Sequence, residues 1–190
     1  ILHWWGDESP IAPLKAPGIP KPRRSFGGAV IGNEFFAVGG IGEGNELAQT
    51  VDVFSFTERT WRQITSPHTP RVFPSLVSTA DKLYLHGGFT KINGHFAPAT
   101  SLEVYDVHTN AWTIVSEQLT GISANMAMLN YNGRLLFYGV DDQRAGLAHF
   151  VLLDPAPKQD PELVVSTGFG NRASGESPAA RNSKLLMRRD

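Results

Sequence analysis

The side chains that most often carry out catalysis or bind metals are scattered along this sequence. Six histidines occur without close metal-ligand spacing, namely His3, His68, His86, His95, His108 and His149. His86 stands on an apolar stretch ending in Gly-Gly, where a partly buried imidazole with satisfied hydrogen bonds is favoured over a ligand. Asp141 and Asp142 could pair as acid and base or hold a cation, but a solvated turn is favoured. With no cysteine and no Gly-x-Ser-x-Gly element, the sequence offers no assembled catalytic or metal set, and we predict no cofactor.

Two loop segments carry more distinctive chemistry. Residues 41–46 are rich in glycine, but they lack Walker or dinucleotide spacing and precede no expected helix, so a phosphate cradle is not predicted. Residues 89–96 place Phe89, Ile92, His95 and Phe96 on an expected exposed loop, which is typical of a protein-binding hot spot. The alternative is a loop that folds over its own structural unit.

The composition excludes several classes of partner. The 190 residues carry 17 basic and 18 acidic side chains, so nucleic acid and anionic membranes are not predicted partners. No apolar run approaches the length of a membrane span. The chain begins at Ile1 without a visible targeting signal, so we expect a mature or excised piece, and export from the cytoplasm stays open. The 19 glycines and 13 prolines, separated by short apolar runs, favour many short strands.

Internal repetition is the strongest signal in the sequence. Pro22-Arg23 and Pro70-Arg71 each open a stretch that leads to an apolar run ending in Gly-Gly. The two glycine pairs lie 48 residues apart, and they are followed by matching segments that end in tryptophans 51 residues apart. The matching segments are Val51 to Phe54 with Trp61, and Leu102 to Asp106 with Trp112. Several residue classes that recur in one order indicate a repeated structural unit.

A degraded third copy and two partial copies extend this pattern. Residues 126–139 follow the same plan, but Val140 replaces the second glycine and residues 163–165 take the place of the missing Trp segment. Trp4 or Trp5 resembles the end of a preceding copy, and residues 178–187 repeat the opening. The predicted divisions are a preceding end and linker (1–21), three units (22–69, 70–121 and 122–166), and a loop with the first strand of a further unit (167–190).

Each copy is expected to form four strands. In the first copy these are residues 26–31, 34–38, 50–54 and 60–64, joined by short turns. One four-stranded sheet cannot bury its own faces, so neighbouring sheets must stack, and radial stacking gives a propeller. We therefore predict an all-β propeller segment of about three four-stranded blades, with partial blades at both ends.

The repeat resembles a known family. A Gly-Gly pair ending an apolar strand, an aromatic residue, and a Trp some seven residues later, at about fifty-residue spacing, is similar to the kelch repeat. The residues that carry the match are Gly39, Gly40, Phe54 and Trp61, then Gly87, Gly88, Tyr105 and Trp112. The resemblance covers residues 22–154 and implies a ring of about six or seven blades, of which this chain holds about half.

The resemblance also implies classes of function. Most kelch proteins resemble binding modules, such as actin binders, substrate adaptors of ubiquitin ligases, and scaffolds. A minority are enzymes: galactose oxidase needs copper and a Cys-linked Tyr, which a chain without cysteine lacks, and another is the bacterial sialic-acid mutarotase. We therefore expect non-catalytic recognition of a protein or peptide through the propeller loops. The alternative is a carbohydrate-active enzyme that uses Arg24 with an acidic partner from another blade.

The resemblance further implies where a ligand would bind. In kelch adaptors, pocket residues stand where the innermost strand of each blade begins. The residues carried over to this place are Arg24 with Ser25, Val72 with Phe73, Asn125, and Arg181 with Asn182. An arginine here would suit a carboxylate or an acidic peptide. The alternative is that Arg23, Arg71 and Arg181 recur as structural elements of the repeat.

Strand accounting gives a final expectation. Three blades would leave two open ends with apolar faces and lone strands at Trp4-Trp5 and residues 181–189, and unpaired edges favour association. We predict that the chain does not exist as an isolated monomer. More of the same polypeptide is favoured over another chain as the source of the missing blades.

Overall fold

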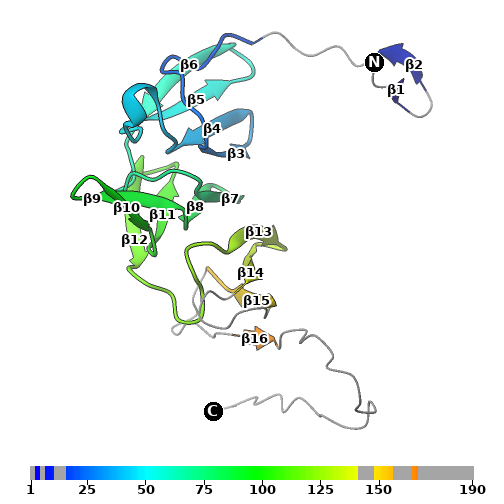
Figure 1. The fold of residues 1–190 in the computed structure, drawn as a ribbon. Helices are drawn as coiled ribbons and strands as arrows, with labels where there is room; N and C mark the ends of the chain where they lie inside the picture. The colour runs from blue at the N-terminus through cyan, green and yellow to red at the C-terminus, as the bar shows by residue number, and fades with distance from the viewer. Residues whose placement is uncertain (1–2, 5–6, 11–15, 141–147, 156–163, 167–190) are drawn as a thin grey trace.

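Short apolar runs between tight turns form the strands of this chain. The computed structural model describes residues 3–4, 7–10, 16–140, 148–155 and 164–166 (Figure 1). Within these residues the chain is built from strands, with a single 3-10 turn, η1 (Glu43–Asn45). The turn at Asn132-Gly133, where both residues have positive φ, is the kind that joins two strands of a hairpin. The prediction of an all-β fold is confirmed.

Three antiparallel sheets of four strands follow one another along the chain. Blade 1 contains β3 (Gly27–Ile31), β4 (Glu34–Val38), β5 (Val51–Ser55) and β6 (Thr60–Ile64). Blade 2 contains β7 (Ser75–Thr79), β8 (Lys82–His86), β11 (Leu102–Asp106) and β12 (Ala111–Ser116). Blade 3 contains β13 (Ala127–Tyr131), β14 (Arg134–Val140), β15 (Ala148–Leu153) and β16 (Val164–Ser166). The strands predicted for the first copy are found within one residue of their predicted bounds.

Successive blades stack face to face, and their cores lie between the sheets. Blade 1 packs on blade 2 through buried side chains that include Phe36, Val53, Leu85 and Tyr105. Blade 2 packs on blade 3 through a second cluster, which includes Val77, Leu102, Met128 and Phe137. The first strand of blade 2, β7, contacts both β3 and β13, so these three strands line the inner edge of the stack (Figure 1).

The repeated tryptophans tie blades 1 and 2 to the chain segment that precedes each of them. The Trp112 Nε1–H donates a 2.9 Å hydrogen bond to the Thr65 carbonyl, in the segment that leaves blade 1. The Trp61 Nε1–H donates an equal 2.9 Å bond to the Pro17 carbonyl. Residues 16–20 therefore contact blade 1 as the segment after β6 contacts blade 2. Each tryptophan also packs on the aromatic residue of its own blade, Phe54 at 5.2 Å and Tyr105 at 5.4 Å between ring centres.

One expectation about the strands was wrong. Trp4 is not on a lone strand, because β1 (His3–Trp4) pairs with β2 (Asp7–Pro10). Residues 89–96, expected as an exposed loop, form a hairpin in which β9 (Phe89–Ile92) pairs with β10 (His95–Pro98), and Ile92, His95 and Phe96 are exposed. The expectation for residues 163–165 held in part, since β16 is the fourth strand of blade 3. Trp5, Asp141, Asp142, Arg181 and Asn182 lie outside the described residues.

Candidate functional site at the start of the inner strands

Two recurring arginines are buried in ion pairs inside the blades. Arg71 Nη2 lies 2.6 Å from Glu103 Oε1, and neither side chain is exposed to solvent. Arg23 Nη1 lies 2.5 Å from Asp52 Oδ2 in blade 1, in an equally buried pair. Burial lowers the pKa of Arg71, while the Glu103 carboxylate opposes this shift. Both arginines therefore contact the interior of their blade and are not available to a ligand.

The pair of blade 2 also holds the segment that leads into its inner strand, β7. Glu103 accepts hydrogen bonds from the backbone N–H groups of His68 and Thr69, at 2.6 and 3.1 Å. Arg71 donates to the carbonyl groups of Thr69 and Ser101. Because Glu103 binds the N–H groups of this segment and Arg71 binds one of its carbonyl groups, both side chains hold the chain before β7 in place.

The first glycine of each pair allows two blades to approach each other closely. A Cβ at Gly39 would lie 2.4 Å from the Arg71 carbonyl oxygen, and one at Gly87 would lie 2.4 Å from that of Ala124. The next residue then donates across the blades, from Gly40 N–H to Arg71 at 2.8 Å and from Gly88 N–H to Ala124 at 3.0 Å. Blade 3 repeats this only in part, since Gly139 is followed by Val140.

Three of the predicted site residues meet where the inner strands of blades 1 and 2 begin. The Phe73 N–H donates a 2.8 Å hydrogen bond to the Ser25 carbonyl. Both residues have left-handed backbones, with φ of 55° for Phe73 and 59° for Ser25, which costs an L-residue about 1–2 kcal/mol. Arg24 precedes Ser25, is exposed, and its Nη2 lies 3.4 Å from Asn45 Oδ1. Both Arg24 and Phe73 are exposed to solvent.

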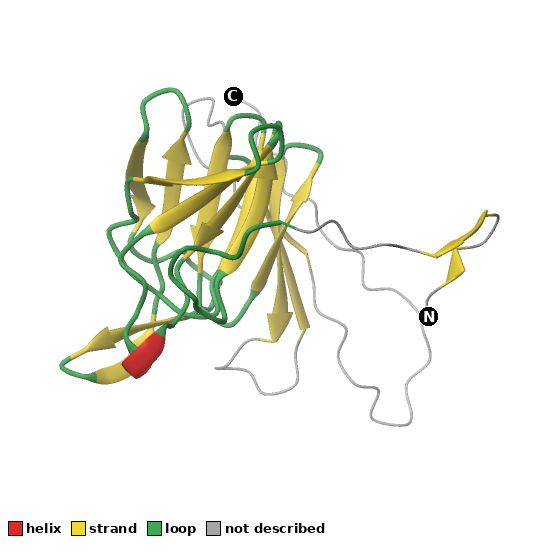
Figure 2. Cartoon of the chain, turned by 90° about the horizontal axis from the view of Figure 1, so that it is seen from above, coloured by secondary structure: helices red, strands yellow, loops and turns green. Residues whose placement is uncertain are grey.

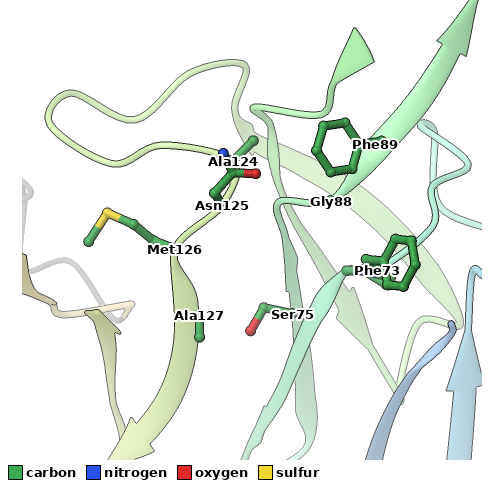
Figure 3. Close-up of a pocket in the computed structure, with 9 residues that line it drawn as sticks. Phe73, Ser75, Gly88, Phe89, Ala124, Asn125, Met126 and Ala127 are labelled. Atoms are coloured by element: carbon green, nitrogen blue, oxygen red, sulfur yellow. The ribbon is translucent and has the colours of Figure 1, made fainter. Parts of the chain in front are cut away.

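A cavity of about 270 Å³ lies beside Phe73, between blades 2 and 3. Its lining residues are Phe73, Pro74, Ser75, Gly88, Phe89, Ala124, Asn125, Met126 and Ala127. Figure 3 shows the Phe73 and Phe89 rings on one side and the Ala124–Ala127 chain on the other, with the Met126 side chain directed away. The cavity therefore brings together three predicted site residues, Phe73, Phe89 and Asn125.

The β9–β10 hairpin reaches from blade 2 to the neighbouring blade. Phe89 packs against a buried cluster of Ile41, Leu47 and Val72, and Lys91 Nζ donates to the Asn45 carbonyl at 2.6 Å. Figure 2 shows η1 next to this hairpin. The segment thus folds over blade 1, whereas the alternative drawn from the sequence placed it over its own blade.

The remaining two predicted site residues lie on this hairpin and do not line the cavity. Phe96 is about half exposed, and Lys91 Nζ stands 5.7 Å from the centre of its ring. His95 is exposed and pairs with Ile92 across the Asn93-Gly94 turn. A partner would reach both residues only if it extended beyond the cavity.

His86, expected from the sequence to be partly buried, is completely buried two residues before Gly88 of the cavity wall. Its Nε2–H donates to the Ser123 carbonyl at 3.2 Å, and its ring meets Phe137 edge-on at 5.2 Å. Burial lowers the pKa of His86, and the nearby Arg71 cation lowers it further, while the Ser123 and Ser101 carbonyls oppose the shift. The neutral ring thereby holds the segment that forms one cavity wall.

The described residues contain no group of three or more His, Cys, Asp or Glu side chains that could hold a metal ion. His108 Nε2 contacts Asp81 Oδ2 at 2.5 Å on turns of blade 2, and Lys82 contacts Asp106 at the adjoining ends of β8 and β11. Among these residues, no helix is long and apolar enough to cross a membrane.

Comparison with known proteins identifies the repeat. Residues 22–68 and 70–118 match the family model of the Kelch motif, and together they make up just over half of the chain. The chain belongs to the kelch-repeat family. The matched segments contain the four strands of blade 1 and the four strands of blade 2.

Three kelch relatives show the range of proteins that carry similar repeats. Kelch-like protein 25 of Rattus norvegicus is 29% identical over 126 residues, covering 64% of this chain and 21% of the relative. An F-box/kelch-repeat protein of Arabidopsis thaliana is 35% identical over 103 residues, covering 53% of this chain and 33% of the relative. Kelch-like protein terF of Aspergillus terreus is 30% identical over 122 residues, covering 61% and 26%. The chain thus spans between a fifth and a third of the length of these relatives.

Two of the features that the sequence predictions missed have a signal in the sequence. Asp52 and Glu103 each stand between apolar residues at the same place in the repeat, which marks them as the buried partners of the recurring arginines. The Asn93-Gly94 dipeptide between two apolar runs is a strong hairpin signal. The cavity had no such signal, because it depends on how two blades meet.

Proposed function

We propose that this kelch domain binds a protein or peptide, without catalysis, at the end of the blades where the inner strands begin. The observation that carries the proposal is the cavity lined by Phe73, Phe89 and Asn125. Arg24 is exposed and precedes Ser25, whose carbonyl accepts a hydrogen bond from the Phe73 N–H. Aromatic residues and arginine are the residue types that most often dominate protein interfaces. The recurring acids Asp52 and Glu103 are already paired with arginines inside the blades.

The relatives support the same class of function in general terms. Their names describe kelch-like and F-box/kelch-repeat proteins, and kelch repeats in such proteins typically bind other proteins.

The test compares partners captured by the wild-type protein with those captured by two variants. Arg24→Ala and Phe73→Asn are expected to lose the same partner, whereas Val115→Ala, which changes an exposed apolar residue on the outer strand β12, is expected to retain it. A candidate partner is then purified and titrated by calorimetry. Thermal stabilisation by sialic acid that disappears in Arg24→Ala, without any protein partner, would favour the carbohydrate-active alternative.

We also propose that further blades cover the open face of blade 3, from the same polypeptide or from another chain. Support comes from Leu129, Tyr138 and Phe150, which are exposed on this face. Light scattering tests the proposal: this chain alone should associate, and a monodisperse monomer of 20.7 kDa would contradict it.

A further inference from the structure

Two hairpin turns of this chain have the same sequence and nearly the same backbone. Asn93-Gly94 joins β9 to β10, and Asn132-Gly133 joins β13 to β14. The φ angles are 51° and 80° in the first turn and 52° and 81° in the second. All four residues are exposed, and a Cβ at either glycine would meet no atom within 4 Å. A difference in chemistry between the two turns must therefore come from their neighbours.

An exposed asparagine that is followed by glycine can react with its own backbone. The backbone nitrogen of the glycine attacks the side-chain carbonyl carbon, Cγ, of the asparagine, and glycine has no Cβ that would block the approach. The Cγ–Nδ2 bond breaks, and the amide group leaves as ammonia together with the proton of the glycine N–H. Water then opens the cyclic imide at one of its two carbonyl carbons, which leaves aspartate or isoaspartate. The reaction needs no reactant other than water.

The attacking nitrogen is held in one turn and not in the other. The Gly133 N–H donates a 2.9 Å hydrogen bond to Asn130 Oδ1. In the β9–β10 hairpin the residue at the position of Asn130 is Lys91, whose ammonium group donates hydrogen bonds and accepts none. Lys91 Nζ instead donates to a backbone carbonyl of blade 1 at 2.6 Å. Within the described part of the chain, the Gly94 N–H has no such acceptor.

A hydrogen bond on the glycine nitrogen opposes the reaction in two ways. The nitrogen must lose its proton before it can attack, and the bond to Asn130 retains that proton. The nitrogen must also move toward Cγ of Asn132, and the bond keeps Gly133 in its place in the turn. A hydrogen bond of this kind usually changes an equilibrium by a factor of about 2–10. Gly94 lacks this restraint.

We propose that Asn93 is a site of spontaneous deamidation, whereas Asn132, in the same kind of turn, is protected by Asn130. The reaction adds a negative charge at the tip of the β9–β10 hairpin, between the exposed Ile92 and His95. Where isoaspartate forms, the main chain runs through Cβ, and the turn gains one backbone atom. The surface that this hairpin offers to solvent therefore changes as the protein ages.

Peptide mapping of the complete chain, aged at mildly alkaline pH, tests the proposal. Chymotrypsin separates the two sites, because it cuts after Phe89 and Phe96 around the first and after Tyr131 before the second. Mass spectrometry then measures the fraction of each amide that has become a carboxylate. We expect Asn93 to convert about 2–10 times faster than Asn132. In denaturant, where both hairpins are lost, the two rates should become equal.

Variants of Asn130 test the protecting bond. Asn130→Ala removes the acceptor and should raise the rate at Asn132 by about 2–10-fold, while the rate at Asn93 stays unchanged. Asn130→Asp is the matched control, because it keeps an acceptor oxygen and loses only the amide group, whose Nδ2 donates to the Ser78 carbonyl. This control should leave Asn132 as slow as it is in the wild type.

The reciprocal change supplies an acceptor to the other hairpin. Lys91→Asn should slow the reaction at Asn93 by about 2–10-fold. Lys91→Ala loses the same bond to the Asn45 carbonyl but offers no acceptor, so it should not slow the reaction. The two variants therefore separate the effect of the acceptor from the effect of the lost lysine.

Each outcome decides the inference. Equal rates at Asn93 and Asn132 in the folded protein, or no conversion of Asn93, would overturn it. An unchanged rate at Asn132 in Asn130→Ala would do the same, as would a difference between the two sites that persists in denaturant. Equal rates at Asn93 in Lys91→Asn and Lys91→Ala would show that an acceptor does not protect this turn, and would also overturn the inference.

Discussion

Blades 2 and 3 have the same apolar pattern but differ in what covers them. Three positions on the face directed toward the following blade can be compared, because they have the same strand register in both blades. Val77, His86 and Leu102 of blade 2 correspond to Leu129, Tyr138 and Phe150 of blade 3, in that order. In blade 2 these side chains are 7%, 0% and 0% exposed, and in blade 3 they are 50%, 37% and 42% exposed. The comparison teaches that stacking, and not the pattern within one blade, decides burial here.

The two blades also differ in how they fill the same interior position. Blade 2 buries Arg71 against Glu103. In blade 3, Ala124 replaces Arg71, because its carbonyl accepts the hydrogen bond between blades that the Arg71 carbonyl accepts in blade 2. Val151 replaces Glu103, because it pairs with Phe137 on the neighbouring strand as Glu103 pairs with Leu85. An ion pair and an apolar pair can therefore serve the same repeat, since burying a charge pair is often no more stabilising than apolar packing.

The largest expected effect comes from breaking the ion pair of blade 2. Arg71→Ala leaves the Glu103 carboxylate buried and unpaired, so we expect a loss of about 3–5 kcal/mol in the free energy of unfolding. Denaturant titration measures it. The double variant Arg71→Ala with Glu103→Val, which copies blade 3, should lose clearly less. A double variant as unstable as the single one would contradict this explanation.

A second prediction concerns the close contact between blades 2 and 3. Gly87→Ala places a Cβ 2.4 Å from the Ala124 carbonyl oxygen at a φ of 72°, and should cost at least about 2 kcal/mol. Gly133→Ala is the control, because Gly133 also has a positive φ but meets no atom within 4 Å. It should cost about 1 kcal/mol. Equal losses in thermal unfolding would show that the contact is unimportant.

A third prediction concerns the pH dependence of the free energy of unfolding, to which the buried His86 of blade 2 contributes. The pKa of His86 is lowered in the folded state, so the unfolded chain binds a proton first as the pH falls below about 6.5. Stability should be full above this pH and should decline below it by up to about 1.4 kcal/mol per pH unit. His86→Val, which copies Val38 of blade 1, should flatten this part of the profile. His95→Gln, a change at an exposed site, should not.

The smallest expected effect is on the open face of blade 3. Phe150→Ser should change the unfolding free energy of this chain by less than about 0.5 kcal/mol, because the side chain is already partly exposed. Leu102→Ser, at the corresponding buried position of blade 2, should cost several times more. In light scattering, Phe150→Ser should also reduce association. A large loss of stability in Phe150→Ser would show that this face is covered within the chain.

The sequence was sufficient for the blades because their signals are local. Strands such as β4 follow from apolar runs between turn residues, and the glycine and tryptophan positions set the repeat length. The site was predicted only as a set of places, since Phe73, Phe89 and Asn125 are distant in sequence. Whether their side chains share a cavity depends on the angle at which two blades stack, and this angle is not encoded by any single segment.

The paired tryptophan bonds have a consequence for how the molecule opens. Because Trp112 is bound to Thr65 and Trp61 to Pro17, blades 1 and 2 each hold the chain segment that enters them. Detachment of residues 16–20 would free the Trp61 indole while leaving that of Trp112 protected. The two indole protons should therefore exchange with deuterium at different rates, Trp61 first, so that opening between these two blades begins at blade 1.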